Sequence, residues 1–518
     1  MAQRAKDGRK SRNAPLAVDG RLAAEDIVRV ARSGHPVTLS PAAVEAIRAC
    51  RGLIDRIAVS QRPVYGVTTG VGELRNVFIS PQDAMRLQQN IIRSHAAGVG
   101  DPLPEDAVRA TMLLRAHTLA RGYSGVRPGI VRLLVGMLNA GVHPLIPAQG
   151  SVGASGDLAP LAHLALAMTG EGTADHKDKR MPAGVALRRA RLRPVRLRAK
   201  EGLALINGTQ VMTALAVLAL VDAERLVKIA DIAAAMSFEA LAATDEPLDS
   251  ALHALRPHPG QQASAANLRA LIEGSENVAA GRAATVQDAY SLRCAPQVHG
   301  AARDALSYVR RVLEVEVDAV TDNPICFVDR EAVVSGGNFH GQPVALAADV
   351  LAIAVAELAN IAERRVERLV NPYLSGLPAF LTSRSGLHSG YMLAQYTAAA
   401  LVSENKVLTH PASVDSIPTS ANQEDHVSMG TIAARKAGQV VRNAQQVLGI
   451  ELVCAAQALD LRGGRRGRGT EAASRVIREH IPPLDEDRTL EGDLRTAADL
   501  VRSNSLLATV ESAVHGLT

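Results

Sequence analysis

Long stretches of apolar residues at helical spacing are the feature that most constrains how this chain can fold. The longest pattern begins at Pro343, a residue suited to the first turn of a helix, and runs to Leu369, before Pro372. Roughly 27 residues at about 1.5 Å each make a helix of about 40 Å. Comparable patterns predict helices over residues 209–241, 298–315, 395–408 and 433–459. The chain is therefore predicted to be mainly α, a bundle of long helices.

Composition indicates how these helices pack. Apolar residues make up 47% of the chain, but aromatic residues only 2%, with no Trp. The interior must then be filled by Ala, Leu, Val and Ile, which favours closely packed helices. The length of 518 residues allows more than one domain. We expect a disordered basic tail over residues 1–18, an N-terminal domain over 19–205, and a long-helix bundle with a C-terminal helical region over 206–518.

Other classes of protein find little support in the sequence. The basic tail has no apolar segment of the kind that a secretory signal needs. Residues 211–221 form an apolar stretch that Asp222 and Glu224 interrupt far short of a membrane span, so we expect no membrane role. The four cysteines form no C-x-x-C pair and the fifteen histidines show no metal-ligand spacing, so we expect no metal site. A reducing cytoplasm is the expected location.

Residues 150–157, which read GSVGASGD, are the segment most indicative of chemistry. They match neither a phosphate-binding loop nor a nucleophile elbow, because the Gly-Lys-Ser/Thr and Gly-x-Ser-x-Gly patterns are absent. The small residues could simply allow tight backbone packing before a helix. Alternatively, the Gly156 amide could attack the Ala154 carbonyl while Ser155 loses its hydroxyl as water. Cyclisation of Ala154, Ser155 and Gly156 in this way would give a 4-methylidene-imidazole-5-one ring.

This segment resembles the prosthetic-group motif of the histidine, phenylalanine and tyrosine ammonia-lyases and the related aminomutases. The resemblance covers about residues 20 to 515. It implies the fumarase/aspartase-like bundle of long helices, a homotetramer whose active sites combine loops from several subunits, and a small aromatic amino acid as the substrate. The other matching segments are residues 65–72 (YGVTTGVG), 94–98 (SHAAG), 202–209 (GLALINGT), 290–294 (YSLRC), 337–340 (GNFH) and 422–428 (NQEDHVS).

The resemblance also implies roles for individual residues. Tyr65 would be the base that removes a β-hydrogen. Because a free phenol has a pKa near 10, neighbouring positive charge or hydrogen-bond donors would have to favour its phenolate. Arg293 would bind the substrate carboxylate through two parallel donors. Asn207 and Gln287 would orient the substrate and the ring, although Asn207 could instead be a helix N-cap. Tyr290 would lie beside the ring.

The residues expected to determine substrate specificity resemble those of lyases with different substrates. Phe339 resembles a wall of the ring pocket. His95 can hydrogen-bond a phenol or an imidazole but gains nothing from a phenyl group, which disfavours phenylalanine. Glu424 resembles the histidine lyases. Three other residues look more like those of tyrosine lyases: Thr68, Gly341 and Gln342.

Several functions therefore remain open, with a slight preference for L-histidine, which would give urocanate. The alternatives in the same family are an L-tyrosine ammonia-lyase that forms p-coumarate and a tyrosine 2,3-aminomutase. A nucleic-acid-binding protein is the alternative from another class, motivated by the basic tail and by the arginine-rich segments 188–200 and 462–468. Without interleaved aromatic residues these segments offer no stacking platform, so we expect no nucleic-acid partner.

Overall fold

The computed structural model describes residues 14–60, 62–284 and 286–518, which form two compact units. The first unit comprises the described part of Met1–Leu218 together with Arg311–Ala348 and Pro411–Arg435. The second comprises Ala219–Arg310, Asp349–His410 and Lys436–Thr518. The boundary that we expect between residues 205 and 206 falls inside the first unit and stays a prediction.

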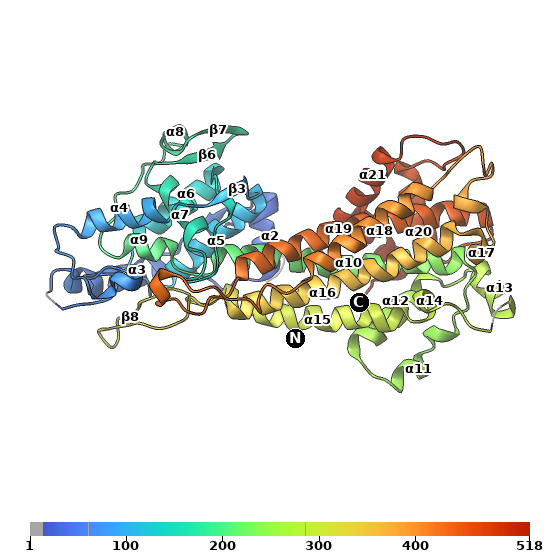
Figure 1. The fold of residues 1–518 in the computed structure, drawn as a ribbon, viewed down its shortest axis with the longest axis horizontal. Helices are drawn as coiled ribbons and strands as arrows, with labels where there is room; N and C mark the ends of the chain where they lie inside the picture. Colours follow the sequence, from blue (N-terminus) through green and yellow to red (C-terminus); the bar gives the residue numbers. More distant parts are fainter. Residues whose placement is uncertain (1–13, 61, 285) are drawn as a thin grey trace. The chain divides into compact units, whose positions relative to one another are not determined.

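Four long helices form the framework of the chain (Figure 1): α10 (Gln210–Ala240), α15 (Ala295–Val317), α16 (Gln342–Val370) and α19 (Gly430–Arg462). Each of them has residues in both units. Their bounds agree closely with the predicted ranges because an apolar pattern sustained over several helical turns dominates local preferences. The predicted mainly α fold of the ammonia-lyase type is confirmed.

The first unit carries shorter helices and small sheets. Helix α2 packs on α5, α5 on α6, and α7 on both α4 and α9. The helices are α2 (Ala24–Ser33), α3 (Pro41–Ala58), α4 (Ala84–His95), α5 (Glu105–Ala120), α6 (Pro128–Ala140), α7 (Leu158–Met168), α8 (Ala183–Arg189) and α9 (Glu201–Ile206), with 3-10 turns η1 (Gly72–Asn76) and η4 (Ser420–Asn422). The strands are β1 (Leu16–Ala17), β2 (Val37–Thr38), β3 (Val99–Pro102), β4 (Val142–Pro144), β5 (Pro147–Gln149), β6 (Thr173–His176), β7 (Lys179–Pro182), β8 (Ile325–Phe327) and β9 (Ala332–Val334).

These strands form pairs and one three-stranded sheet. Strands β1 and β2 are parallel, whereas β3 with β5, β8 with β9, and the sheet β4-β6-β7 are antiparallel. Residues 1–13 of the predicted tail lie outside the described residues. Its last residues pair in β1, because Leu16 N–H donates to the Pro36 carbonyl and Val18 N–H to the Thr38 carbonyl. The predicted disorder is therefore wrong for Leu16–Ala17.

The described residues of the second unit form helices and connecting loops, and none of the named strands lies among them. Helix α20 packs against α22 and α12, and α21 contacts both α20 and α22. The additional helices are α11 (Ser250–Ala254), α12 (Pro259–Leu271), α13 (Glu276–Ala284), α14 (Tyr290–Arg293), α17 (Pro372–Ser375), α18 (Met392–Leu408), α20 (Arg468–His480), α21 (Glu491–Arg502) and α22 (Ser505–Val514), with 3-10 turns η2 (Glu246–Leu248) and η3 (Ala379–Leu381).

Helix α16 shows why apolar length alone does not indicate a membrane span. Among the described residues it is the one helix long and apolar enough to cross a bilayer, with a mean hydropathy of 2.0 over its best window. That window is 67% buried inside the protein, which is typical of a core helix. The feature is therefore explained by packing.

The arginine-rich segment 462–468 is paired with acidic or carbonyl groups of the second unit. The guanidinium of Arg462 donates to the carbonyl oxygens of Ala240 and Ser375. Cations that are neutralised in this way are poorly placed to bind phosphates, which disfavours a nucleic-acid interface here. The ion pairs are Arg465 with Glu276, Arg466 with Asp460, and Arg468 with Glu273.

Candidate active site

The backbone around Ser155 and Gly156 pairs with the turn at Gly208, which links the loop before α7 to the loop before α10. Gly208 N–H donates to the Ser155 carbonyl at 3.1 Å, and Asp157 N–H donates to the Gly208 carbonyl at 2.7 Å. Gly156 has φ +71°, and a Cβ placed there would lie 2.1 Å from the Gly208 oxygen. Only glycine fits this position, and its bare amide is the nucleophile that ring closure requires.

Asp157 ties this loop to two long helices. One carboxylate oxygen accepts hydrogen bonds from the N–H groups of Val211 and Met212, at the start of α10, at 2.8 and 2.9 Å. The other accepts from the hydroxyls of Thr431, in α19, and Ser151. Burial raises the pKa of Asp157 to about 6, against the effect of these donors. The sequence gives no sign of this role, because Asp157 stands next to α7 but caps α10.

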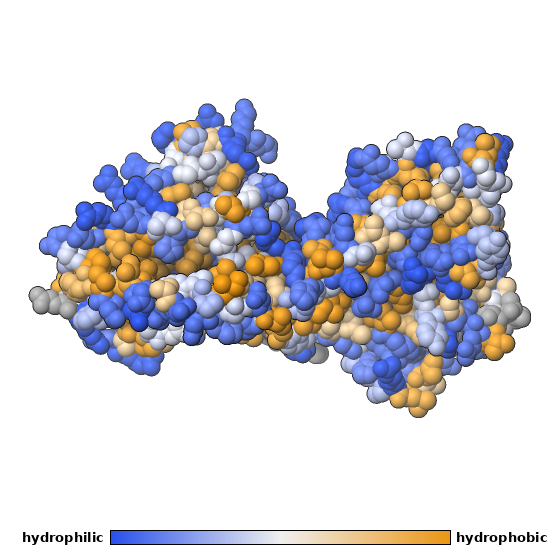
Figure 2. All heavy atoms as spheres, viewed as in Figure 1, coloured by the Kyte–Doolittle hydropathy of each residue, from blue (hydrophilic) through white to orange (hydrophobic). Residues whose placement is uncertain are grey.

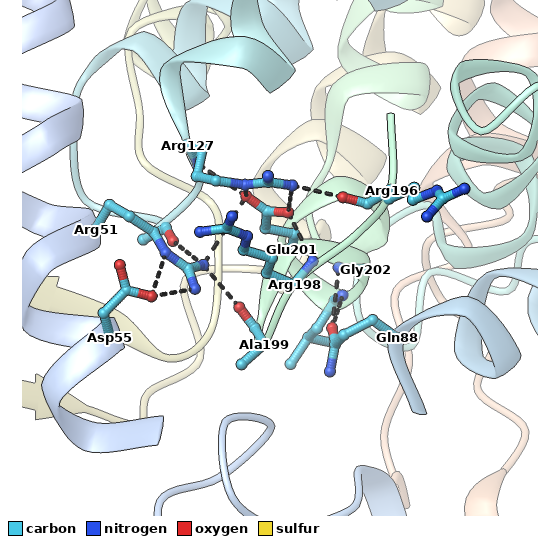
Figure 3. Close-up of polar contacts among 11 residues, drawn as sticks. Arg51, Asp55, Gln88, Arg127, Arg196, Arg198, Ala199, Glu201 and Gly202 are labelled. Atoms are coloured by element: carbon cyan, nitrogen blue, oxygen red, sulfur yellow. Dashed lines mark hydrogen bonds and ion pairs between the residues drawn. The ribbon is translucent and has the colours of Figure 1, made fainter. Parts of the chain in front are cut away.

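Asn207 ends α9, and buried polar groups hold that helix in place. Figure 3 shows Glu201, at the start of α9, accepting from the Arg127 guanidinium at 2.8 and 2.7 Å. The Gln88 side-chain oxygen accepts from the N–H groups of Gly202 and Leu203. Asn207 is the C-cap of α9, so the alternative of an N-cap is wrong.

The Asn207 side chain is fixed by a neighbouring buried ion pair. Its Nδ2 donates to Asp322 at 3.3 Å and to the Asn323 carbonyl at 3.0 Å. Asp322 also pairs with Lys200 at 2.8 Å, and both of these side chains are fully buried. The amide nitrogen is therefore held by the protein, which leaves the side-chain oxygen of Asn207 as the group that can face a ligand.

Tyr65 lies on the loop before η1 and is half-buried. Its hydroxyl oxygen accepts a hydrogen bond from Gly72 N–H at 3.1 Å. Burial raises the pKa of Tyr65 and the Glu424 carboxylate raises it further, whereas the Gly72 N–H and Arg75 lower it. The net direction is upward, so the expected environment that favours phenolate is not provided by the described residues of this chain.

The Glu424 carboxylate affects both Tyr65 and His95 electrostatically. Its carboxylate accepts from the Thr419 hydroxyl at 2.7 Å and raises the pKa of both Tyr65 and His95. Burial, the largest effect on His95, lowers the pKa of that imidazole. Its Nδ1 lies 3.0 Å from the Ser94 hydroxyl. The Glu424 carboxylate thus acts electrostatically on a phenol from the loop before η1 and on an imidazole from the last residue of α4, all in the first unit.

The remaining predicted residues divide between the units. Phe339 lies in the first unit, partly buried in the loop between β9 and α16. Gln287, Tyr290 and Arg293 belong to the second unit, on or just before α14. The Arg293 guanidinium lies 4.6 Å from the centre of the Tyr290 ring, and Tyr290 is 70% exposed. The structure therefore places the Arg293 guanidinium over the Tyr290 ring, and in the first unit brings Glu424 close enough to shift the pKa of both Tyr65 and His95.

The three residues that resemble tyrosine lyases have structural roles in this chain. The Thr68 hydroxyl donates to the Arg62 carbonyl and accepts from Val64 N–H, and the residue is 3% exposed. A Cβ at Gly341 would lie 2.4 Å from the Met212 sulfur. The Gln342 amide donates to the Ser413 carbonyl at 3.0 Å. These contacts give the three residues a structural role in this chain, so their identity is a weaker indicator of the substrate.

The model of the aromatic amino acid lyase family matches residues 22–479. The chain belongs to this family. The lyase is 57% identical over 502 residues to a histidine ammonia-lyase of Gloeobacter violaceus, which covers 96% of this chain and 98% of that relative. The solved histidine ammonia-lyase of Trypanosoma cruzi is 46% identical, with a TM-score of 0.89 and coverage of 96% and 95%. The tyrosine aminomutase of Streptomyces globisporus is 38% identical, with a TM-score of 0.91 and coverage of 96% and 99%.

These similarities confirm the family resemblance and the predicted class of carbon-nitrogen lyase. They extend over nearly the full length of the lyase and of each relative, so the comparison involves whole proteins. No group of three or more His, Cys, Asp or Glu side chains within the described ranges is arranged to hold a metal ion.

Proposed function

We propose that this lyase removes ammonia from L-histidine to give urocanate. The observation that carries the proposal is the Glu424 carboxylate, which acts on both Tyr65 and His95. A carboxylate accepts hydrogen bonds only, and the N–H of a substrate imidazole is a suitable donor. The phenol of tyrosine is a weaker match, since it stays uncharged near neutral pH, whereas an imidazole, with a pKa of about 6.5, can also pair with the carboxylate as a cation. The whole-length identity to histidine ammonia-lyases supports the same substrate.

The residues at 154–156 fit a self-made prosthetic ring, because Gly156 is confined to a backbone conformation and a space that exclude any side chain. In the proposed cyclisation the Gly156 nitrogen bonds to the Ala154 carbonyl carbon. The carbonyl oxygen leaves as water with the amide hydrogens of Ser155 and Gly156. Ser155 then loses its hydroxyl and α-hydrogen as a second water. The ring would supply an electrophilic alkene that captures the substrate amine and improves it as a leaving group.

The other side chains bind and orient the substrate. Arg293 holds the carboxylate, and the Tyr290 ring lies against its guanidinium. Tyr65 takes the β-hydrogen as a proton on its phenolate oxygen. Asn207 and Gln287 orient the reacting groups, and Phe339 limits the pocket.

We also propose a homotetramer in the cytoplasm. Figure 2 shows hydrophobic side chains gathered at several places on the surface in view. Large exposed apolar side chains that a partner copy could cover include Leu346 and Ile353 on α16, and Leu393, Tyr396 and Val407 on α18. Exposed apolar side chains of this size are typical of an interface between subunits.

The test is to incubate the purified lyase separately with L-histidine, L-tyrosine and L-phenylalanine and to follow near-UV absorbance. We expect urocanate from histidine, and little or no product from phenylalanine because His95 and Glu424 would be left without partners. Each mixture is also analysed for a β-amino acid. Formation of p-coumarate or β-tyrosine at rates above that of urocanate would overturn the assignment.

The raised pKa of Tyr65 predicts how the rate depends on pH. If phenolate is the working form, kcat at saturating histidine rises with pH below that pKa, by about tenfold per unit at most. Replacing Glu424 with Gln removes one cause of the raised pKa, so the rising limb should move to lower pH. The check is the pH profile of kcat for both proteins. A limb that stays in place or moves upward would show that Glu424 does not act on the base.

A further inference from the structure

Arg115, on α5, is a fully buried guanidinium directly beneath the Asn207-Gly208 turn. Its Nη1 donates to the Asn207 carbonyl at 2.7 Å and to the Gln210 side-chain oxygen at 2.8 Å. A Cβ at Gly208 would lie 2.9 Å from the same nitrogen, so the turn rests closely on the guanidinium. Burial lowers the pKa of Arg115 to about 10, so it stays charged at neutral pH.

The contacts of Arg115 do not suggest that its main role is to stabilise the folded protein. Its Nε and Nη2 are buried and receive no hydrogen-bond partner from the part of the chain that the structure describes. A buried charge with unsatisfied donors costs free energy, and an apolar side chain of similar volume is often equal or better for folding. A different advantage is therefore needed to explain why a charged group occupies this place.

One peptide plane connects Arg115 with the candidate ring. The carbonyl that accepts from Arg115 belongs to Asn207, and the N–H of the same peptide bond belongs to Gly208. That N–H donates to the Ser155 carbonyl at 3.1 Å. Hydrogen bonds in a chain polarise one another, so a positive charge on the carbonyl side strengthens the N–H as a donor. The Gly208 carbonyl also accepts from Asp157 N–H, which fixes the far side of Gly156.

We propose that Arg115 is a positioning residue that holds the Asn207-Gly208 turn against residues 155–157, so that Ala154, Ser155 and Gly156 cyclise and the Ser155 carbonyl stays polarised. The inference rests on the proposed function, because it assumes that the ring forms. It assigns Arg115 no contact with substrate. Its effect reaches the reacting atoms through the peptide bond between residues 207 and 208.

The test compares Arg115→Met and Arg115→Lys with the wild type by intact-protein mass and near-UV absorbance. Cyclisation removes two water molecules, so the mass reports it without any assay of turnover. We expect most Arg115→Met chains to keep both waters. Arg115→Lys keeps the charge but lacks the planar pair of donors, so we expect a partial loss of cyclisation. In its cyclised fraction the absorbance maximum should shift to shorter wavelength, because the Ser155 carbonyl is less polarised.

Arg109→Met is the matched control. Arg109 lies on the same helix, is 6% exposed and donates to the carbonyls of Val30, Ala31 and Leu138. We expect it to lower the thermal midpoint while leaving the two-water loss complete. Cyclisation equally complete in Arg115→Met and the wild type would overturn the proposal. The proposal would also be overturned if Arg109→Met and Arg115→Met had the same thermal midpoint and lost cyclisation to the same extent. Wild-type protein that keeps both waters would instead remove the prosthetic ring from the proposed function.

Discussion

Ser155→Ala is expected to fold like the wild type, to keep the mass of an uncyclised chain and to lose ammonia-lyase activity by about a thousandfold or more. Alanine has no β-hydroxyl to lose, so no alkene can form. The contacts that hold this segment use the Ser155 carbonyl and the backbone of Asp157, which the substitution leaves unchanged. Intact mass, the thermal midpoint and urocanate formation are measured on the same preparation.

The control for this variant is Ser307→Ala, which removes a hydroxyl that donates to the Arg303 carbonyl within α15. It should cyclise and turn over normally. If Ser155→Ala formed urocanate at the wild-type rate, the self-made electrophile would have no part in the reaction. A large fall in its thermal midpoint would instead indicate that the serine has a structural role.

Tyr65→Phe is expected to lower kcat by about 10² to 10⁴-fold while the protein still loses two waters. The substitution removes one oxygen, which accepts from Gly72 N–H and is the proposed proton acceptor. Because the ring shape is kept, KM should change much less than kcat. Steady-state kinetics with histidine, together with intact mass, separate a lost base from a lost prosthetic group.

Tyr123→Phe is a suitable comparison. Tyr123 packs edge-on against Phe327 at 6.0 Å between ring centres, and phenylalanine can keep that contact. Its kinetics should match those of the wild type. If Tyr65→Phe retained full kcat, the proton would have to be taken by another group, and His95 would be the next candidate to test.

The long helices were predictable from the sequence because their apolar pattern repeats over many turns, and α10 and α16 begin within one residue of the predicted positions. The short strands were not predicted, since pairs of two to four residues depend on contacts with distant segments. Strand β1 illustrates this, because Leu16–Ala17 is ordered by pairing with Val37–Thr38. Local composition there indicates only a polar tail.

In the candidate site, too, some features were predictable from the sequence and others depend on contacts with distant segments. Motif resemblance located Tyr65, His95 and Glu424, and the structure adds that Glu424 acts on both of the others. Asp157 and Arg115 were not predictable as supports, because the partners of their side chains, apart from Ser151, lie between 54 and 274 residues further along the chain. The protonation state of Tyr65 was also beyond the sequence, since burial and a distant carboxylate determine it.

The way Gly156 is held has a practical consequence for redesign. The Gly208 turn holds Gly156 through main-chain hydrogen bonds, whereas the side chains proposed to recognise the substrate ring come from other segments: His95 from the end of α4 and Glu424 from the loop after η4. Ring formation and substrate choice are therefore encoded in separable parts of the chain. A library that varies positions 95 and 424 while keeping residues 150–157 and 207–211 fixed should yield variants with an altered substrate range. These variants should still cyclise residues 154–156 by themselves.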